Sequence, residues 1–303
     1  MKLAAIDIGS NAIRLQIVTV FEEAHMVSFK KLEYLRFPLR LGHDVFKKGK
    51  ITPATESQFK KLMQTFKLLI ELYQVKNYYA VATSAMREAS NGELIRKKTK
   101  SEVGLDINII NGRKEANILN KAIIPNLEDE NYIHIDVGGG STELNVFRGK
   151  KLIKSQSFKI GSVRKLSEKD RKVTVDAMQK WSLKAFPKKA KNIIGIGTGG
   201  NINKLFKIAN KTKTNVIGLA ELKALRAYVK AYSNRDRIKI LKMNPDRADV
   251  IVPASDIYIS VLENVGSDQI IVPKVGLKDG MIYDLYEQTS GRQIGELEFL
   301  EDF

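Results

Sequence analysis

Asp7-Ile8-Gly9-Ser10-Asn11 and Asp136-Val137-Gly138-Gly139-Gly140-Ser141-Thr142-Glu143 are two versions of one turn, and each lies between apolar runs. Aligning Asp7 with Asp136 also aligns Gly9 with Gly138. Each copy predicts a strand, an acidic residue, a small-residue turn and a second strand. A glycine turn exposes backbone N–H groups to phosphate oxygens, because no Cβ blocks the approach, and a carboxylate can hold Mg²⁺ through water. We therefore expect two turns that bind a phosphate chain and its metal ion.

Apolar periodicity predicts the same order of elements in both halves of the chain. In the first half we expect strands over 3–8 and 13–20, a helix over 52–73, a strand over 78–83 and a helix beginning near Arg113. In the second half we expect strands over 133–137 and 144–147, a helix over 174–186, a strand over 193–197 and a helix after Gly199-Gly200. Strands that alternate with helices favour mixed sheets covered by helices. The predicted fold class is α/β, with duplicated domains over 1–120 and 121–303, an interdomain cleft, and a last helix (about 276–290) that packs back on the first domain.

The charge of the chain predicts an anionic partner. Its 303 residues include 51 Lys and Arg against 34 Asp and Glu, a formal net charge of +17, which attracts polyanions. A nucleic-acid partner is not favoured, since no motif combines aromatic and basic residues.

No apolar run is long enough to span a membrane, and the absence of cysteine excludes disulfides and thiolate metal sites. The N-terminus runs directly into a strand, so we expect no secretory signal and a cytoplasmic location. The oligomeric state stays open, and a homodimer is the commonest oligomer.

Six segments in order resemble one family. They are Ala5-Ile6-Asp7-Ile8-Gly9-Ser10-Asn11, Ala82-Thr83-Ser84-Ala85-Met86-Arg87, Asn111-Gly112-Arg113-Lys114-Glu115-Ala116, Asp136-Val137-Gly138-Gly139-Gly140-Ser141-Thr142-Glu143, Gly197-Thr198-Gly199-Gly200 and Arg247-Ala248-Asp249-Val250. Together they resemble the exopolyphosphatase / guanosine pentaphosphate phosphohydrolase (Ppx/GppA) family. The resemblance implies two actin-like domains with an active-site cleft between them. It also implies Mg²⁺-dependent release of terminal phosphate from inorganic polyphosphate, from pppGpp or from both.

Glu115 is the predicted catalytic residue. The resemblance places it at the family's catalytic glutamate, immediately before an alanine. The residues alone put it in the first turn of a helix, after an Asn-Gly turn, where a carboxylate could instead only stabilise the helix N-terminus. Family members often carry a second acid just before this glutamate, and here that position is Lys114. A cation at this place could lower the proton affinity of the base or draw phosphate closer.

The remaining predicted site residues bind phosphate or metal. Metal-facing carboxylates are expected at Asp7, Asp136 and Glu143, with Mg²⁺ or another hard divalent cation as cofactor. Phosphate donors are expected at Gly9, Ser10, Asn11, Arg87, Gly138, Gly139, Gly140 and Ser141. Arg87 follows a strand and can bind phosphate oxygens with two parallel hydrogen bonds. Gly199 and Gly200 follow an apolar strand and are expected to contact a nucleotide or a phosphate. His134 lies in a buried-type strand and is expected to be structural.

Two other functions remain open at the level of sequence. The first is a phosphotransferase that moves phosphate between polyphosphate and a nucleoside diphosphate, since the same superfold hosts kinases. The second is a non-catalytic sensor that binds polyphosphate or an alarmone with the same turns. Hydrolysis of a phosphoanhydride by a water that Glu115 activates is the leading hypothesis.

Overall fold

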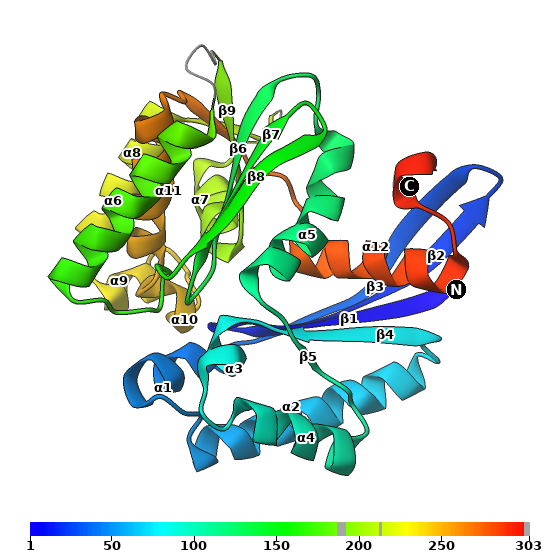
Figure 1. Ribbon diagram of the computed structural model, residues 1–303. Helices are drawn as coiled ribbons and strands as arrows, with labels where there is room; N and C mark the ends of the chain where they lie inside the picture. Colours follow the sequence, from blue (N-terminus) through cyan, green and yellow to red (C-terminus); the bar gives the residue numbers. More distant parts are fainter. Residues whose placement is uncertain (187–191, 212–213, 300–303) are drawn as a thin grey trace. The chain divides into compact units, whose positions relative to one another are not determined.

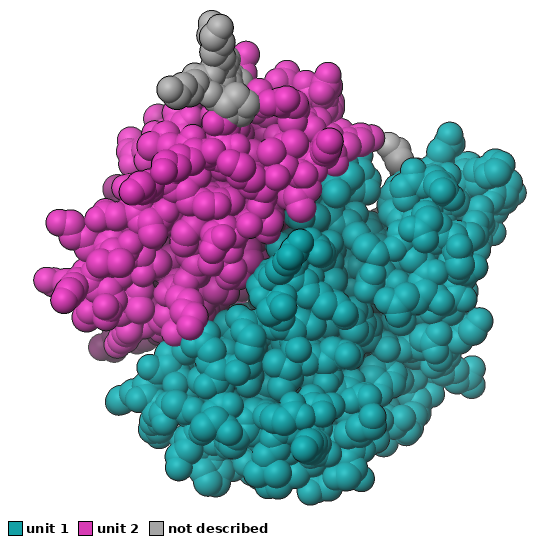
Figure 2. Space-filling model, in the orientation of Figure 1, with its two compact units in different colours: residues 1–125, 276–303 teal, residues 126–275 magenta. Residues whose placement is uncertain are grey.

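The chain divides into two compact units. The structure, a computed structural model, describes residues 1–186, 192–211 and 214–299. The first unit comprises Met1–Pro125 and Gly276–Phe303, and the second comprises Asn126–Val275 (Figure 2). The predicted division was 1–120 and 121–303, with the last helix returning to the first domain. In the structure the C-terminal segment from Gly276 groups with the first unit, because its helix packs on the first strand and on the helix that ends at Ile123.

The first unit contains a six-stranded sheet in the order β12-β3-β2-β1-β4-β5 (Figure 1). β1 is antiparallel to β2, which is antiparallel to β3, whereas β4 and β5 run parallel to β1. The short β12 pairs in parallel with the start of β3. The bounds are β1 Lys2–Ile8, β2 Ile13–Glu23, β3 Met26–Phe37, β4 Asn77–Ala82, β5 Asn108–Ile109 and β12 Glu298–Phe299.

The sheet of the second unit repeats this topology. Its order is β10-β11-β9-β6-β7-β8, so β8-β7-β6-β9-β11 corresponds to β3-β2-β1-β4-β5. The β6–β7 and β7–β8 pairs are antiparallel, and β9 runs parallel to β6. The bounds are β6 Asn131–Val137, β7 Thr142–Arg148, β8 Lys151–Phe158, β9 Ile193–Thr198, β10 Val216–Gly218 and β11 Gln269–Ile271. The predicted α/β class with two duplicated domains is therefore confirmed.

Helices cover the sheets on faces that the strand alternation selects. In the first unit, alternate residues of β1 and β2 face the core with α1 and α2, and the remaining ones face α12. The helices of this unit are α1 Leu41–Lys48, α2 Pro53–Leu72, α3 Ser84–Glu88, α4 Gly92–Val103, α5 Gly112–Ile123 and α12 Leu277–Ser290. Those of the second unit are α6 Glu168–Ala185, α7 Gly200–Ala209, α8 Leu219–Ala231, α9 Asn234–Lys239, α10 Pro245–Ala248 and α11 Ile251–Val265. Within the described residues, none of these helices has the length and apolar composition that crossing a membrane requires.

Local capping signals decide where the helices begin. Thr52 accepts a hydrogen bond from the Thr55 N–H and starts α2 as predicted. α6 begins at Glu168, earlier than the predicted Thr174, because the Ser167 side chain accepts from the Asp170 N–H and caps the helix there. The sequence did not predict α1, which follows a residue in the left-handed conformation, Arg40 at φ 55°, with no side-chain cap.

The contact between α12 and α5 positions the helix that carries Glu115. A Cβ on Gly280 would lie 2.0 Å from the carbonyl oxygen of Ile118 in α5. We expect Gly280→Ala to destabilise the first unit by about 1–3 kcal/mol, because α12 must move away from α5. Denaturant unfolding measures this loss. Gly295→Ala is the control, since nothing lies within 4 Å of a Cβ at that position. Equal stability of the two variants would contradict a tight α12–α5 contact.

Candidate functional site

The two glycine turns have the same internal hydrogen bond. In the first unit the Gly9 N–H donates to the Ala12 carbonyl over 3.2 Å. In the second unit the Gly138 N–H donates to the Ser141 carbonyl over 3.0 Å. Each turn joins the central strand of its sheet to the antiparallel neighbour. The repeated turn that the sequence predicted is therefore present in both units.

Three segments of the first unit lie side by side at the carboxyl edge of its parallel strands. The Thr83 N–H, after β4, donates to the Ile8 carbonyl at the end of β1 over 3.2 Å. The Ile110 N–H, after β5, donates to the Ala82 carbonyl over 3.0 Å. This edge is where open α/β sheets bind ligands. It gathers Asp7, the segment from Ser84 to Arg87 and the start of α5 into one region of the first unit.

α5 places Glu115 at the N-terminus of a helix. The Asn111 side chain caps the helix by accepting from the Lys114 N–H over 2.9 Å, and the Asn111 carbonyl accepts from the Glu115 N–H over 3.0 Å. Glu115 is 8% exposed, whereas Lys114 is exposed. Arg87 donates from its guanidinium to the Ile110 carbonyl, immediately before the cap. The first unit thus has the positive N-terminal end of α5 at the segment that Arg87 binds, and the buried Glu115 carboxylate lies in the first turn of that helix.

The first glycine turn is held by its neighbours α1 and α3. The hydroxyls of Ser10 and Ser84 are 2.8 Å apart and both residues are buried. The Ser10 carbonyl accepts from the Gly42 N–H over 2.8 Å, and the Asn11 carbonyl accepts from the Arg40 N–H over 3.2 Å. A Cβ on Gly42 would lie 3.0 Å from that of Ser10. These contacts give the turn a defined shape, as a preorganised phosphate site requires.

The duplicated hairpins differ at the position opposite the aspartate. In the first unit Asp7 faces Arg14 across the strands, and an ion pair of 2.5 Å joins the Arg14 Nη1 to the Asp7 Oδ2. In the second unit Asp136 faces Glu143, so two carboxylates occupy directly opposed positions on one face. Glu143 is 1% exposed and accepts from the Ser157 hydroxyl over 2.9 Å. Opposed like charges are unfavourable, and a cation between them would relieve the repulsion. The two hairpins therefore differ in the charge that faces the aspartate.

A row of buried polar side chains leads to Asp136. The His134 Nε2 lies 2.8 Å from the Thr198 Oγ1, and the Thr198 hydroxyl donates to the Asp136 Oδ1 over 2.7 Å. The Asn145 amide lies 3.0 Å from the His134 Nδ1, which fits the tautomer that carries its proton on Nε2. Complete burial lowers the pKa of His134 to about 3, so its ring is neutral at physiological pH. This row orients the Asp136 carboxylate, and it agrees with the structural role that the sequence predicted for His134.

The neutral state of His134 makes the second unit sensitive to acid. Its folded pKa, about 3, lies below the unfolded value of 6.5, so the unfolded chain binds the extra proton between these values. The contribution of the neutral His134 ring to the free energy of unfolding is therefore complete above pH 6.5. As the pH falls below that value, the free energy of unfolding decreases by at most roughly 1.4 kcal/mol per pH unit. We expect His134→Gln to flatten the pH dependence of unfolding followed through Trp181, the chain's single tryptophan. His43→Gln, at an exposed position, is the control. Equal slopes in wild type and His134→Gln would contradict the argument.

The glycines of the second turn rest on a loop that follows β8. The carbonyl oxygens of Gly138 and Gly139 accept backbone hydrogen bonds of 2.8–3.0 Å from residues 162–164, and the Arg164 Nε donates to the Gly140 carbonyl over 2.6 Å. A Cβ on Gly161 would lie only 2.6 Å from the Gly139 carbonyl. Within the described part of the chain, no backbone carbonyl accepts from the N–H groups of Gly139 and Gly140. The carbonyl oxygens of the turn are thus held by residues 162–164.

Gly199 and Gly200 lie next to Asp136 in the second unit. Gly199 has a φ of +103°, and a Cβ there would lie 3.3 Å from the Asp136 Oδ1. The Tyr258 hydroxyl donates to the Thr198 carbonyl. Burial, together with the charge of Asp136, raises the pKa of Tyr258 well above its usual value. Arg247 donates from its guanidinium to the Gly200 carbonyl. This turn therefore borders the same carboxylate as the second glycine turn.

The predicted site residues divide between the two units, and we call those of each unit a set. Asp7, Ser10, Asn11, Arg87 and Glu115 belong to the first set, and Asp136, Gly138–Ser141, Glu143, Gly199 and Gly200 belong to the second. In the part of the chain that the structure describes, no group of three or more His, Cys, Asp or Glu residues is arranged to hold a metal ion. Asp136 and Glu143 form a pair of carboxylates, and one or two carboxylates, together with phosphate and water, are a common set of ligands for Mg²⁺.

Sequence reasoning gave no role to three residues that shape these sets. Arg14 could have been found by aligning the two hairpins, because it occupies the position of Glu143. Thr198 is part of the Gly197-Thr198-Gly199-Gly200 segment, yet its contact with Asp136 depends on the parallel pairing of β9 with β6. Tyr258 lies 60 residues beyond Thr198, and no local pattern links the two.

Comparison with known proteins bears on the family and the fold of the chain. The sequence pattern of the Ppx/GppA phosphatase family matches residues 19–289. A solved structure of the Aquifex aeolicus member of that family is similar, with a TM-score of 0.76, 26% identity, and coverage of 95% of this chain and 98% of the other.

Curated relatives carry names of phosphate-releasing enzymes. A "Bifunctional 3-dehydroquinate synthase/phosphatase" of Fusobacterium nucleatum is 29% identical, over 89% of this chain and 44% of that protein. A "Guanosine-5'-triphosphate,3'-diphosphate pyrophosphatase" of Photobacterium profundum is 24% identical, over 97% and 61%. "Exopolyphosphatase 2" of Mycobacterium tuberculosis is 24% identical, over 94% and 98%. The chain thus spans about half the length of the first two relatives and nearly the whole of the third.

Proposed function

This chain belongs to the Ppx/GppA phosphatase family, and from that membership we propose that it hydrolyses phosphoanhydride bonds, releasing terminal phosphate from inorganic polyphosphate or from pppGpp. The names of the relatives support this reaction class. The exopolyphosphatase, which matches this chain over 98% of its own length, favours polyphosphate. The name of the pyrophosphatase supports pppGpp, and the match with this chain covers a smaller share, 61%, of that protein.

The observation that carries the proposal is the position of Glu115. It is a buried carboxylate in the first turn of α5, at the carboxyl edge of β1, β4 and β5, and it follows by five residues Ile110, whose carbonyl Arg87 binds. In the proposed reaction the Glu115 carboxylate accepts a proton from water while the water oxygen attacks phosphorus. The bond between phosphorus and the bridging oxygen breaks, and the shortened chain leaves with the electron pair. Arg87 and the N-terminus of α5 stabilise the negative charge on the phosphate oxygens.

Each glycine turn has a proposed part in binding. The N–H groups of Gly139 and Gly140 and the Ser141 hydroxyl would bind phosphate oxygens in the second unit. Gly9, Ser10 and Asn11 would do so in the first. Because the donors are already oriented by the contacts of each turn, binding needs little rearrangement. Asp136 and Glu143 would hold Mg²⁺, which when bound neutralises charge on the phosphate chain.

One assay tests the proposed function. Phosphate release is followed side by side from long-chain polyphosphate, tripolyphosphate and pppGpp, each with Mg²⁺ and with a chelator. We expect Mg²⁺-dependent release from at least one of the three. ADP is added in a parallel reaction, because formation of ATP in place of free phosphate would identify a phosphotransferase. If the protein binds one of the three substrates tightly but releases phosphate from none of them, the proposed enzyme is wrong and the chain is a non-catalytic sensor.

A further inference from the structure

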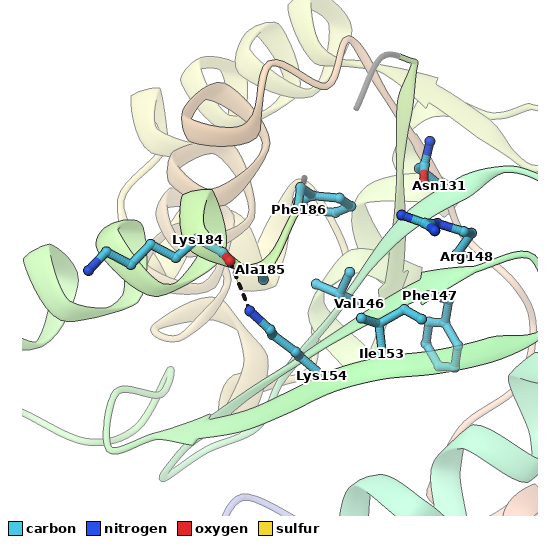
Figure 3. A pocket seen from close by; sticks show the side chains of 9 residues that line it. All are labelled: Asn131, Val146, Phe147, Arg148, Ile153, Lys154, Lys184, Ala185 and Phe186. Atoms are coloured by element: carbon cyan, nitrogen blue, oxygen red, sulfur yellow. Dashed lines mark hydrogen bonds between the residues drawn. The ribbon is translucent and has the colours of Figure 1, made fainter. Parts of the chain in front are cut away.

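The second unit contains a cavity at the end of its sheet away from Asp136. It has a volume of about 270 Å³ and lies between β6–β8 and the end of α6 (Figure 3). Its lining is Asn131, Val146, Phe147, Arg148, Ile153, Lys154, Lys184, Ala185 and Phe186. β6 starts at Asn131 beside this cavity and reaches Asp136 five residues later. At about 3.3 Å per residue, roughly 16 Å separates the cavity from that carboxylate. We call it the bulge pocket.

A β-bulge builds the pocket. The register pairs Val146 with Lys154 and Phe147 with Leu152, so Ile153 opposes no residue of β7. Neighbouring side chains of a regular strand point to opposite faces, and a bulge re-aims one of them. Here Ile153 and Lys154 both line the pocket. Ile153 is 42% exposed, so the bulge places an aliphatic side chain at an open wall beside an ammonium group.

The charges of the pocket are all positive. Arg148 and Lys154 contribute cationic groups, Lys184 contributes its carbonyl while its ammonium points away from the cavity (Figure 3), and no carboxylate is part of the lining that the described residues form. The Lys154 ammonium donates to the Lys184 carbonyl over 2.9 Å, which fixes it at the last turn of α6 (Figure 3). Arg148 is exposed and forms no ion pair with any residue of the described ranges. Two cations beside Ile153 and Phe186 suit a ligand with one anionic end and one apolar ring.

We propose that the bulge pocket binds a small organic phosphate of nucleoside monophosphate type, at a site separate from the phosphate turns. The phosphate group lies between Arg148 and Lys154, because guanidinium and ammonium groups bind phosphate strongly. The ring packs against Ile153 and Phe186. The Asn131 carboxamide supplies a polar group at the ring edge. The volume of about 270 Å³ limits the occupant to a single small molecule.

The single tryptophan reports on this site. Trp181 lies on α6, one turn before Lys184, and its ring packs edge-on against Phe158 at 5.9 Å. Titration with GMP is expected to give a saturable change in Trp181 fluorescence, and ribose 5-phosphate is expected to bind more weakly because it lacks the ring. Arg148→Ala should weaken GMP binding by about tenfold or more, through loss of a charged hydrogen bond. Ile153→Ala should weaken GMP binding but leave ribose 5-phosphate binding unchanged.

The matched control is Lys150→Ala, which removes an exposed cation from the same hairpin but from outside the lining. It should bind GMP like the wild type. The proposal is overturned by the absence of a saturable signal at millimolar GMP or by equal losses in Lys150→Ala and Arg148→Ala. If Arg148→Ala lowers the melting temperature, Arg148→Met serves instead, because it keeps a long unbranched side chain without the charge. Binding is read without turnover, so the outcome is independent of phosphoanhydride hydrolysis.

Discussion

Glu115→Gln is expected to lower kcat for phosphate release by about a hundredfold to ten-thousandfold, the range that a positioned general base contributes. Glutamine keeps the size of the side chain and its place in the first turn of α5, yet it cannot take a proton from water. KM should change little, because the glycine turns and Arg87 are intact. The measurement is steady-state phosphate release from whichever substrate the wild-type protein uses.

A matched variant separates this chemistry from an effect on the helix end. Glu93 lies in the first turn of α4, as Glu115 does in α5. A carboxylate at such a position stabilises the helix by about 0.3–1 kcal/mol. Glu93→Gln should therefore cost a similar amount of stability while leaving kcat unchanged. If Glu115→Gln retained most of the wild-type rate, another group would have to activate the water, and the proposed mechanism would be wrong.

The second large effect concerns the opposed carboxylates of the second unit. We expect Glu143→Gln to raise the Mg²⁺ concentration for half-maximal activity at least about tenfold, since removing one negative charge weakens the attraction for a divalent cation. Asp7→Asn should shift it much less, because the Asp7 carboxylate is already paired with Arg14 at 2.5 Å. The comparison exploits the duplication, as the two aspartates hold equivalent positions in their hairpins.

A second measurement makes this test independent of turnover. A ligand that binds only the folded state stabilises it by mass action. Mg²⁺ should raise the unfolding temperature of the wild type and of Asp7→Asn, and raise that of Glu143→Gln less. A larger loss of Mg²⁺ response in Asp7→Asn than in Glu143→Gln would move the cation site to the first unit.

Short-range patterns were sufficient for most elements of the fold. Alternating apolar residues marked β1, β2, β6 and β7, and the Thr52 cap marked the start of α2. α1 was missed because a left-handed Arg40, with no capping side chain, precedes it. α6 was predicted too short because its first turns carry charged residues on a solvated surface, which weakens the apolar period.

The sequence by itself determined the duplicated hairpins, the order of most strands and helices, and the place of Glu115 at a capped helix start, because each depends on residues a few positions apart. Only the tertiary structure decided that Arg14 neutralises Asp7 while Glu143 faces Asp136, that Thr198 joins His134 to Asp136, and that Ile153 bulges into a cationic pocket. The physical reason is that strand register, and with it the pairing of charges, is set by packing between distant segments, which no local period encodes.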